Sequence, residues 1–437
     1  LALCDRAEKA GVAVNLLLSP HYFPRWALEK WPELKGCHGG FFGYCVHAPE
    51  ARGVIERSLE TVIPRIKDHP ALHSVCLSNE PICVDRTGCA IAAEQWPRWL
   101  RRRHGTIARL NRRWQTDYRS FEEIPVPGPV FEASPSAYDF TLYNQETFAD
   151  VHRWMAECIH AMAPDLPVHA KIMMHAHFPR NLHGVWSVSP ELFGKLSDIN
   201  GNDCSRYYRR QGEWTSDWIG HQMACDFQRS VADAPVFNSE NHIIRDRDHD
   251  VVPPEHLYAA LWQGALHGQS ATTIWVWERT YDYTHGFAGS ILHRPDAVAA
   301  VGRACLDMNR LAVPLTALQN RNPRVVFLWS LASTVRGDGH VPALRSAYRE
   351  AAFLGLPLGF VTERQLTRYA EGTAALPRPL AEAELLVVPG ATHVARAAWP
   401  GLRRFARDGG GIVVTGASPA KDEYSVPYTD TLPAMRR

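Results

Sequence analysis

Short apolar segments alternate with helical segments along most of the chain, and this alternation constrains the fold more than any other feature. Each apolar segment has the length of one strand, and a segment with helical periodicity follows it. Strands that alternate with helices form a parallel sheet whose faces the helices cover. The first six apolar segments span residues 12–18, 73–76, 168–174, 197–203, 234–240 and 271–277. They predict an α/β fold up to residue 313, a (β/α)8 barrel of the TIM type whose two N-terminal strands are missing from this chain.

The chain changes character after residue 323. Strands are predicted at residues 324–329, 357–361, 384–389 and 411–415, with helices between them. This order of elements is typical of a doubly wound α/β domain. We therefore divide the chain into a barrel domain, residues 1–313, and a second α/β domain, residues 323–420.

Composition argues against several classes of function. The formal net charge of the 437 residues is +1, which leaves no general positive field to recruit nucleic acid or an acidic membrane. No stretch of 18 apolar residues is present, so the sequence predicts no membrane-spanning helix. The ten cysteines lack the compact spacing of a disulfide scaffold, and most are expected to be buried thiols.

Two strands of the predicted barrel end in a glutamate near an asparagine. Glu80 follows Asn79 after the second apolar segment, and Glu240 follows Asn238 at the end of the fifth. The carboxyl ends of parallel barrel strands meet at one face, so the two carboxylates are expected to converge there. Because hydrolysis of a glycosidic bond needs one carboxylic acid and one carboxylate, this pair predicts a glycosidase site. The alternative is that each glutamate caps a helix or lies on the surface.

Several motifs carry a resemblance to a known family. Residues 78–81, Ser-Asn-Glu-Pro, resemble the Asn-Glu-Pro acid/base motif of the clan A glycoside hydrolases, and residues 238–240 resemble their nucleophile strand. Segments 16–34 and 99–114 are similar to the β-galactosidases of family 42. The resemblance implies a TIM-barrel glycosidase domain followed by a flavodoxin-like trimerisation domain. It also implies retaining hydrolysis of terminal β-linked sugars without a cofactor.

The same resemblance assigns roles to single residues. Glu80 would be the acid/base, Glu240 the nucleophile, and Asn79 a ligand of the sugar 2-hydroxyl. Trp277 lies where the family keeps an aromatic ring under the sugar, and core packing is the alternative. Tyr207 could hold the nucleophile by a hydrogen bond, and a packed residue at the barrel rim is the alternative.

Other candidates are a histidine, four cysteines and a basic segment. His175 is expected to line the substrate cleft, or to lie at the rim without a role. The basic segment 98–113 could bind a polyanion, although a solvated helix face is the expected interpretation. Some family members hold a structural zinc with cysteines in the regions of four cysteines here. These are Cys37, Cys45, Cys83 and Cys89. No metal is expected for this chain, because the spacing departs from the usual close pairs, and unligated thiols are the expected interpretation.

The expected partner is a carbohydrate substrate, with no nucleic acid and no membrane. The family likeness also implies a homo-oligomer, a trimer or dimer, formed through the second domain. Val276-Trp277-Glu278 departs from the Gln-Trp-Arg that family 42 usually has at this place, so the identity of the sugar stays open. A β-agarase-like or β-mannosidase-like hydrolase is one alternative, and a non-catalytic sugar-binding fragment is the other.

Overall fold

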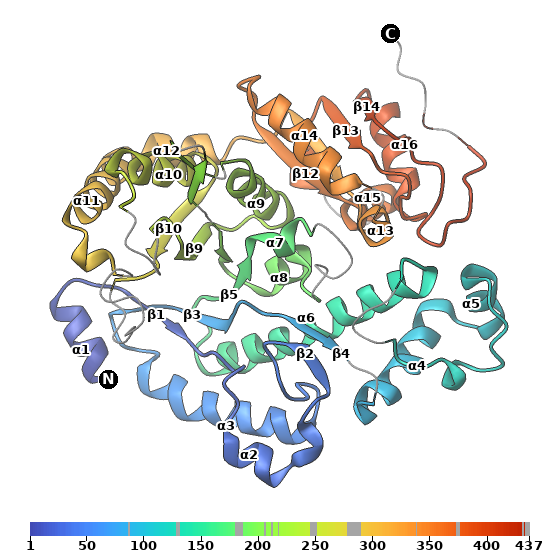
Figure 1. Cartoon of the computed structure of the whole chain (residues 1–437), viewed down its shortest axis with the longest axis horizontal. Coiled ribbons are helices and arrows are strands. Elements are labelled where there is room, and N and C mark those ends of the chain that lie inside the picture. The colour runs from blue at the N-terminus through green and yellow to red at the C-terminus, as the bar shows by residue number, and fades with distance from the viewer. Residues whose placement is uncertain are drawn as a thin grey trace.

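A six-stranded sheet in which all strands run parallel forms the first part of the structure (Figure 1). The computed structural model describes residues 1–85, 88–127, 132–179, 187–204, 207–210, 213–216, 218–244, 251–277, 290–337, 339–372, 376–430 and 432. The strands of the sheet are β1 (Val14–Leu17), β3 (Leu72–Asn79), β5 (Val168–Met173), β6 (Asn200–Asp203), β9 (Val236–Asn241) and β10 (Gln269–Ile274). Their order in the sheet is their order in the chain, as in a TIM barrel, which confirms the predicted parallel arrangement.

Helices connect successive strands and pack around this sheet (Figure 1). Their first turns carry expected signals: Ser134 caps α6 and Ser189 caps α8, each followed by a proline. The helices are α1 (Ala2–Lys9), α2 (Arg25–Lys30), α3 (Pro49–Ile66), α4 (Ala90–His104), α5 (Ile107–Trp114), α6 (Pro135–Met162), α7 (Met174–His177), α8 (Pro190–Leu196), α9 (Trp218–Val231), α10 (Pro254–Leu266), α11 (Pro295–Arg310) and α12 (Ala312–Gln319). None of the helices in the described part is long and apolar enough to cross a bilayer.

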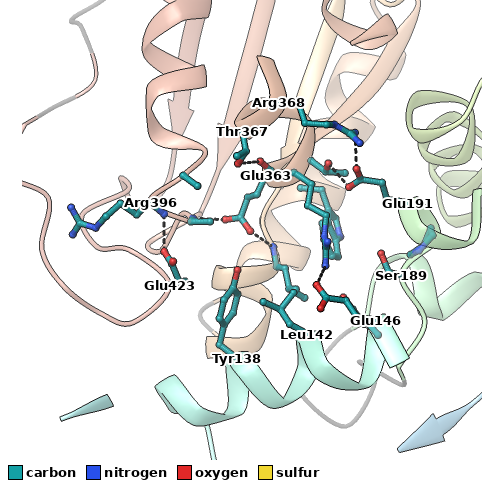
Figure 2. A pocket seen from close by; sticks show the side chains of 18 of the residues that line it. Tyr138, Leu142, Glu146, Ser189, Glu191, Glu363, Thr367, Arg368, Arg396 and Glu423 are labelled. Atoms are coloured by element: carbon teal, nitrogen blue, oxygen red, sulfur yellow. Dashed lines mark hydrogen bonds and ion pairs between the residues drawn. The ribbon is translucent and has the colours of Figure 1, made fainter. Parts of the chain in front are cut away.

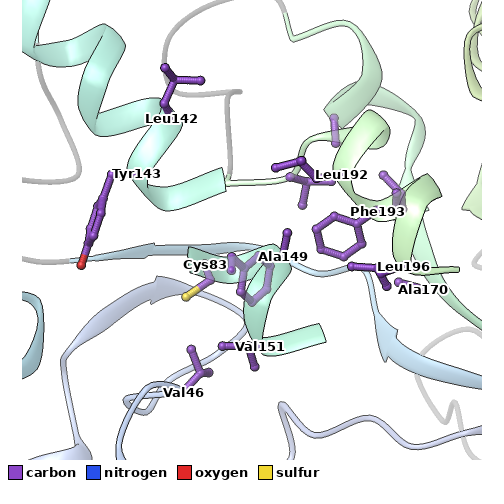
Figure 3. Packing of buried hydrophobic residues seen from close by; sticks show 14 of the residues in the cluster. Val46, Cys83, Leu142, Tyr143, Ala149, Val151, Ala170, Leu192, Phe193 and Leu196 are labelled. Carbon is purple, nitrogen blue, oxygen red and sulfur yellow. The ribbon is translucent and has the colours of Figure 1, made fainter. Parts of the chain in front are cut away.

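The largest apolar core includes the faces that α6 and α8 turn toward each other. Figure 3 shows Leu192 and Phe193 of α8 near Ala149 of α6, and Phe193 is 1% exposed. Burial of such a ring contributes about 1.5–3 kcal/mol. Strands β5 and β6 approach closely at Gly201, where a Cβ atom would lie 2.2 Å from His169 Nδ1. A glycine is therefore required at this position of the barrel wall.

Two helices differ from what the periodicity of the sequence favours. Residues 95–113 have the pattern of one basic helix but form two, α4 and α5, because the chain turns at Gly105 with a φ of +75°. The helical pattern that starts at residue 214 becomes a helix only at Trp218, since residues 213–216 form β8, which pairs with β7. The antiparallel pairs were not predicted; they are β7 (Tyr207–Arg210) with β8 (Glu213–Ser216) and β2 (His38–Gly40) with β4 (Cys83–Asp85).

A second parallel sheet, of order β12-β11-β13-β14, follows the barrel sheet. The chain moves from β11 to one side and then returns to the other, which is the doubly wound arrangement that the sequence predicts. The strands are β11 (Val325–Trp329), β12 (Leu358–Thr362), β13 (Leu385–Pro389) and β14 (Gly411–Thr415), and the helices are α13 (Leu331–Arg336), α14 (His340–Ala352), α15 (Glu363–Glu371) and α16 (Trp399–Arg407). The division of the chain at 313 and 323 stays a prediction.

Candidate active site

Four charged side chains meet at the carboxyl-terminal edge of the barrel sheet. Glu80 follows β3, Lys171 lies in β5, Asp203 ends β6, and Glu240 lies in β9. These strands are neighbours in the order β3-β5-β6-β9, so their ends lie side by side. The two predicted glutamates therefore belong to one charged cluster. Strands β5 and β6, which lie between β3 and β9, supply its other two members, Lys171 and Asp203.

Lys171 forms an ion pair with Glu240. The two residues are 4% and 6% exposed, and Lys171 Nζ contacts Glu240 Oε2. Burial lowers the pKa of Lys171, while nearby acidic groups, among them Asp203 and Glu80, act in the opposite direction. A buried carboxylate needs such a countercharge, because moving an unpaired charge out of water is costly. The pair therefore favours the ionised form of Glu240, which is the form that a nucleophile needs.

Asp203 links this pair to Glu80. Burial, together with a hydrogen bond to the Glu80 carboxyl group, raises the pKa of Asp203 to about 7. A hydrogen bond between two carboxyl groups requires a proton on one of them, since an ionised carboxylate only accepts. A protonated Asp203 can therefore donate this hydrogen bond to the Glu80 carboxyl group near neutral pH.

The backbone at Glu80 is strained. Its φ is +41°, a value that residues other than glycine rarely adopt. Such conformations cost about 1–3 kcal/mol and cluster at functional sites. The residue before it, Asn79, is half-buried and lies in register with Lys171 of the neighbouring strand. This register places Asn79, the residue predicted to bind the sugar 2-hydroxyl, beside the charged cluster.

Two histidines lie close to the cluster. His242 Nε2 is 3.3 Å from Glu240 Oε1 and 3.6 Å from Asp203 Oδ1. Burial and the charge of Lys171 lower the pKa of His21. Donor atoms of Asp203, Glu240 and His242 lie within 4.8 Å of one another, a spacing that could hold a metal ion. A metal cation at this place would be repelled by the Lys171 ammonium group, which already contacts Glu240. The charges therefore suit a site in which Lys171 is the countercharge of the carboxylates better than they suit a metal site.

The other predicted site residues are placed as follows. Trp277 follows β10 and is 59% exposed, so the core-packing alternative is wrong for this ring. His175, which follows the predicted strand 168–174, lies in the one-turn helix α7 and is half-buried. The backbone of Tyr207 belongs to β7, and its side chain lies outside the described part of the structure.

Sequence reasoning missed Lys171, Asp203 and His242, although each carries a signal. Lys171 is a charged residue inside a predicted buried strand, a place where charged residues are rare unless paired. Asp203 ends the next predicted strand at the same sheet edge as the glutamates. His242 follows Glu240 by two residues, the spacing at which strand side chains share a face.

Three of the four candidate cysteines come together from the segments that follow β1 and β3 in the chain. The sulfur atoms of Cys37, Cys45 and Cys89 lie within 4.8 Å of one another, and all three residues are buried. Cys45 Sγ and Cys89 Sγ are 3.9 Å apart. A tetrahedral zinc site with bonds of about 2.3 Å places its sulfurs about 3.8 Å apart, so this spacing fits zinc. A hydrogen bond with Cys45 lowers the pKa of Cys89, while Cys83 is not part of the group.

We expect the purified protein to contain about one zinc ion per chain, held by the three thiolates. Cys89→Ala should remove most of the zinc and lower the Tm, because a structural zinc contributes folding free energy. Elemental analysis and thermal unfolding measure the two effects. Cys225→Ala, which changes a buried cysteine outside the group, should keep the zinc. A parent protein purified without chelators that contains no zinc would contradict this prediction.

The fold and the charged cluster together define a class of protein. A parallel barrel sheet with two carboxylates at its carboxyl-terminal edge is the arrangement of a barrel glycoside hydrolase. Residues 2–303 match glycoside hydrolase family 42, which is described as β-galactosidase. The chain belongs to this family, whose members are retaining glycosidases.

Similar proteins match along nearly the whole chain. The β-galactosidase BgaB of Geobacillus sp. (strain Y412MC61) is 23% identical over 449 residues, which cover 94% of this chain and 62% of BgaB. The apo exo-carrageenase of Bacteroides ovatus, from the same family, superposes with a TM-score of 0.83 at 25% identity, over 96% of this chain and 60% of its own. The cold-adapted β-galactosidase of Rahnella sp. R3 gives 0.78 at 18% identity, over 99% and 65%. The chain spans less than two thirds of the length of these relatives.

Proposed function

We propose that this chain carries the catalytic centre of a retaining β-glycosidase that hydrolyses terminal β-linked galactosides. The observation that carries the proposal is the meeting of Glu80 and Glu240, from strands far apart in the sequence, at one buried cluster with Lys171 and Asp203. Membership of family 42 supports the reaction class. The β-galactosidases among the relatives support the choice of galactose.

The proposed reaction has two steps. Glu240, ionised beside Lys171, attacks the anomeric carbon while Glu80 gives its proton to the leaving oxygen. Water then gives a proton to Glu80 and attacks the same carbon, which releases the sugar from Glu240 with retained configuration. Asp203 acts as a positioning residue, because its hydrogen bond holds the Glu80 carboxyl group in place.

Further assignments are proposed on family likeness and on placement. Asn79 binds the 2-hydroxyl, and the exposed ring of Trp277 stacks under the sugar. His175 lines the cleft, and Tyr207 donates a hydrogen bond to the nucleophile. A homo-oligomer formed through the second domain belongs to the same proposal.

The charges of the cluster favour a neutral sugar at the point of cleavage. Three carboxyl groups, those of Glu80, Asp203 and Glu240, lie near a single lysine and His242. A sulfate group on the reacting sugar would meet this carboxylate cluster at short range, where like charges repel. One similar structure is an exo-carrageenase. Because of this repulsion, a neutral galactoside is nevertheless the better substrate for the cluster of this chain.

A substrate panel tests this proposal. We expect kcat/KM for nitrophenyl β-galactoside to exceed that for its sulfated form by about 100-fold or more, since like charges brought together cost several kcal/mol. Nitrophenyl β-mannoside and agaro-oligosaccharides complete the panel. A preference for the sulfated galactoside would identify a carrageenase-like enzyme. Turnover of none of these substrates would support a non-catalytic sugar-binding fragment.

A further inference from the structure

A second cavity lies between the barrel helices and the second α/β sheet. It has a volume of about 590 Å³, and Figure 2 shows α6 and α8 on one side and α15 on the other. Trp329 at the end of β11, Thr362 at the end of β12, and Ala395 after β13 contribute to its wall. Ligands of doubly wound folds bind outside the carboxyl ends of the strands, at the point where the strand order reverses. The cavity occupies that place.

The N-terminus of α13 lies at this cavity and already binds a carboxylate of the protein, that of Glu363. Glu363 Oε2 accepts hydrogen bonds from the backbone N–H groups of Leu331 (3.1 Å) and Ala332 (3.3 Å), at the start of α13. Its Oε1 accepts from Ser330 Oγ (2.8 Å) and from Ala395 N (2.7 Å). These donors would otherwise suit a nucleotide phosphate. A ligand in this cavity must therefore be bound by other groups.

Those groups are mainly cationic side chains. The cavity is lined by six basic and four acidic residues: Arg103, Arg113, Lys195, Arg364, Arg368 and Arg396, with Glu146, Glu191, Glu363 and Glu423. Within the described part of the chain, Arg364 donates one hydrogen bond, to Glu146 (3.1 Å), and Arg368 donates one, to Glu191 (2.8 Å). Each guanidinium group carries five N–H donors, so most remain for another acceptor.

The basic segment of the sequence supplies two of these cations. Arg103 and Arg113 line the cavity, where Arg103 is exposed and Arg113 is half-buried, so this solvated helix face also faces the cavity. The guanidinium group of Arg113 lies 5.0 Å from the centre of the Tyr424 ring, which fixes its position at the cavity wall.

The cavity also has apolar walls. Trp329, which is 8% exposed, lines it together with Phe227 and Leu142. Apolar and aromatic walls of this kind are the surface on which a sugar ring packs.

We propose that this cavity binds a sugar-sized molecule that carries an oxyanion, a sulfate, a phosphate or a carboxylate. The surplus of guanidinium donors on Arg364 and Arg368 selects an acceptor-rich ligand, and the volume accommodates one or two sugar rings. This site does not depend on the catalytic roles of Glu80 and Glu240, because neither residue lines it.

Titration calorimetry with four probes tests the proposal: galactose 6-sulfate, galactose 6-phosphate, galacturonate and galactose. The titrations use a Glu240→Gln protein, in which the active site does not turn over. We expect saturable binding of at least one charged probe that substitutions in the cavity weaken. Galactose, which the active site can also bind, should show no binding that these substitutions weaken. The probe that binds best identifies the oxyanion.

Substitutions then locate the site. Arg364→Gln should weaken binding about tenfold or more, because it removes a charge-assisted donor. Arg368→Gln, which removes the second guanidinium group with spare donors, should weaken it to a similar extent. Arg349→Gln, an exposed arginine outside the cavity, is the matched control and should bind as the parent does. Failure of all three charged probes to bind, or unchanged affinity in both cavity variants, would overturn the proposal.

Discussion

Glu240→Ala is expected to lower kcat on nitrophenyl β-galactoside by about 10⁴-fold or more, as removal of a covalent nucleophile does in other hydrolases. The loss is large because no other group in the described cluster can replace it. Glu80 and Asp203 are hydrogen-bonded to each other, and Lys171 is a cation. Steady-state kinetics with thermal unfolding of the same sample separates loss of chemistry from loss of fold.

Azide distinguishes the roles of the two glutamates. In Glu240→Ala, azide can occupy the space of the missing carboxylate and attack the anomeric carbon, so the product should be the α-glycosyl azide. In Glu80→Ala, azide should instead attack the covalent intermediate and give the β-glycosyl azide. Glu60→Ala, an exposed residue of α3, is the control and should keep parental activity. More than a tenth of parental kcat in Glu240→Ala would contradict the assignment.

The sequence predicted the two sheets because their signal is local. A short apolar run followed by helical periodicity is contained within about 30 residues, so every strand of both sheets could be placed. The same locality explains the errors. Gly105 breaks a basic segment whose periodicity continues on both sides, and residues 213–216 leave the helical pattern only because they pair with β7.

The candidate site was predicted in part for a similar reason. Glu80 and Glu240 each stand at the end of a recognisable strand, beside an asparagine, and need no knowledge of partners. The role of Lys171 depends on a carboxylate 69 positions away, and the cavity between the two sheets depends on pairs such as Arg364 and Glu146, 218 positions apart. Such contacts follow from the packing of whole elements, which a single sequence does not specify.

Lys171→Met is expected to lower kcat/KM at pH 7 by about 10²–10³-fold, the loss that corresponds to about 3–4 kcal/mol. Methionine keeps most of the length of the side chain and removes its charge. Glu240 is then a buried carboxylate without its countercharge, and an unpaired buried charge costs about 3–5 kcal/mol. The carboxylate avoids this cost by taking up a proton, and a protonated carboxyl group does not attack the anomeric carbon.

The pH dependence separates this role of Lys171 from a merely structural one. If Lys171 keeps Glu240 ionised, the acidic limb of the kcat/KM profile must move to higher pH in Lys171→Met, and activity should partly recover as pH rises. Stability should change in the opposite direction: a carboxyl group that prefers its proton in the folded state is stabilising at low pH, and this contribution is lost as pH rises. Kinetics and thermal unfolding from pH 5 to pH 9 measure both trends. Lys67→Met, an exposed lysine of the same barrel, should shift neither. A uniform loss of activity at all pH values would show that Lys171 does not control the charge of Glu240, since removal of packing alone leaves the acidic limb in place.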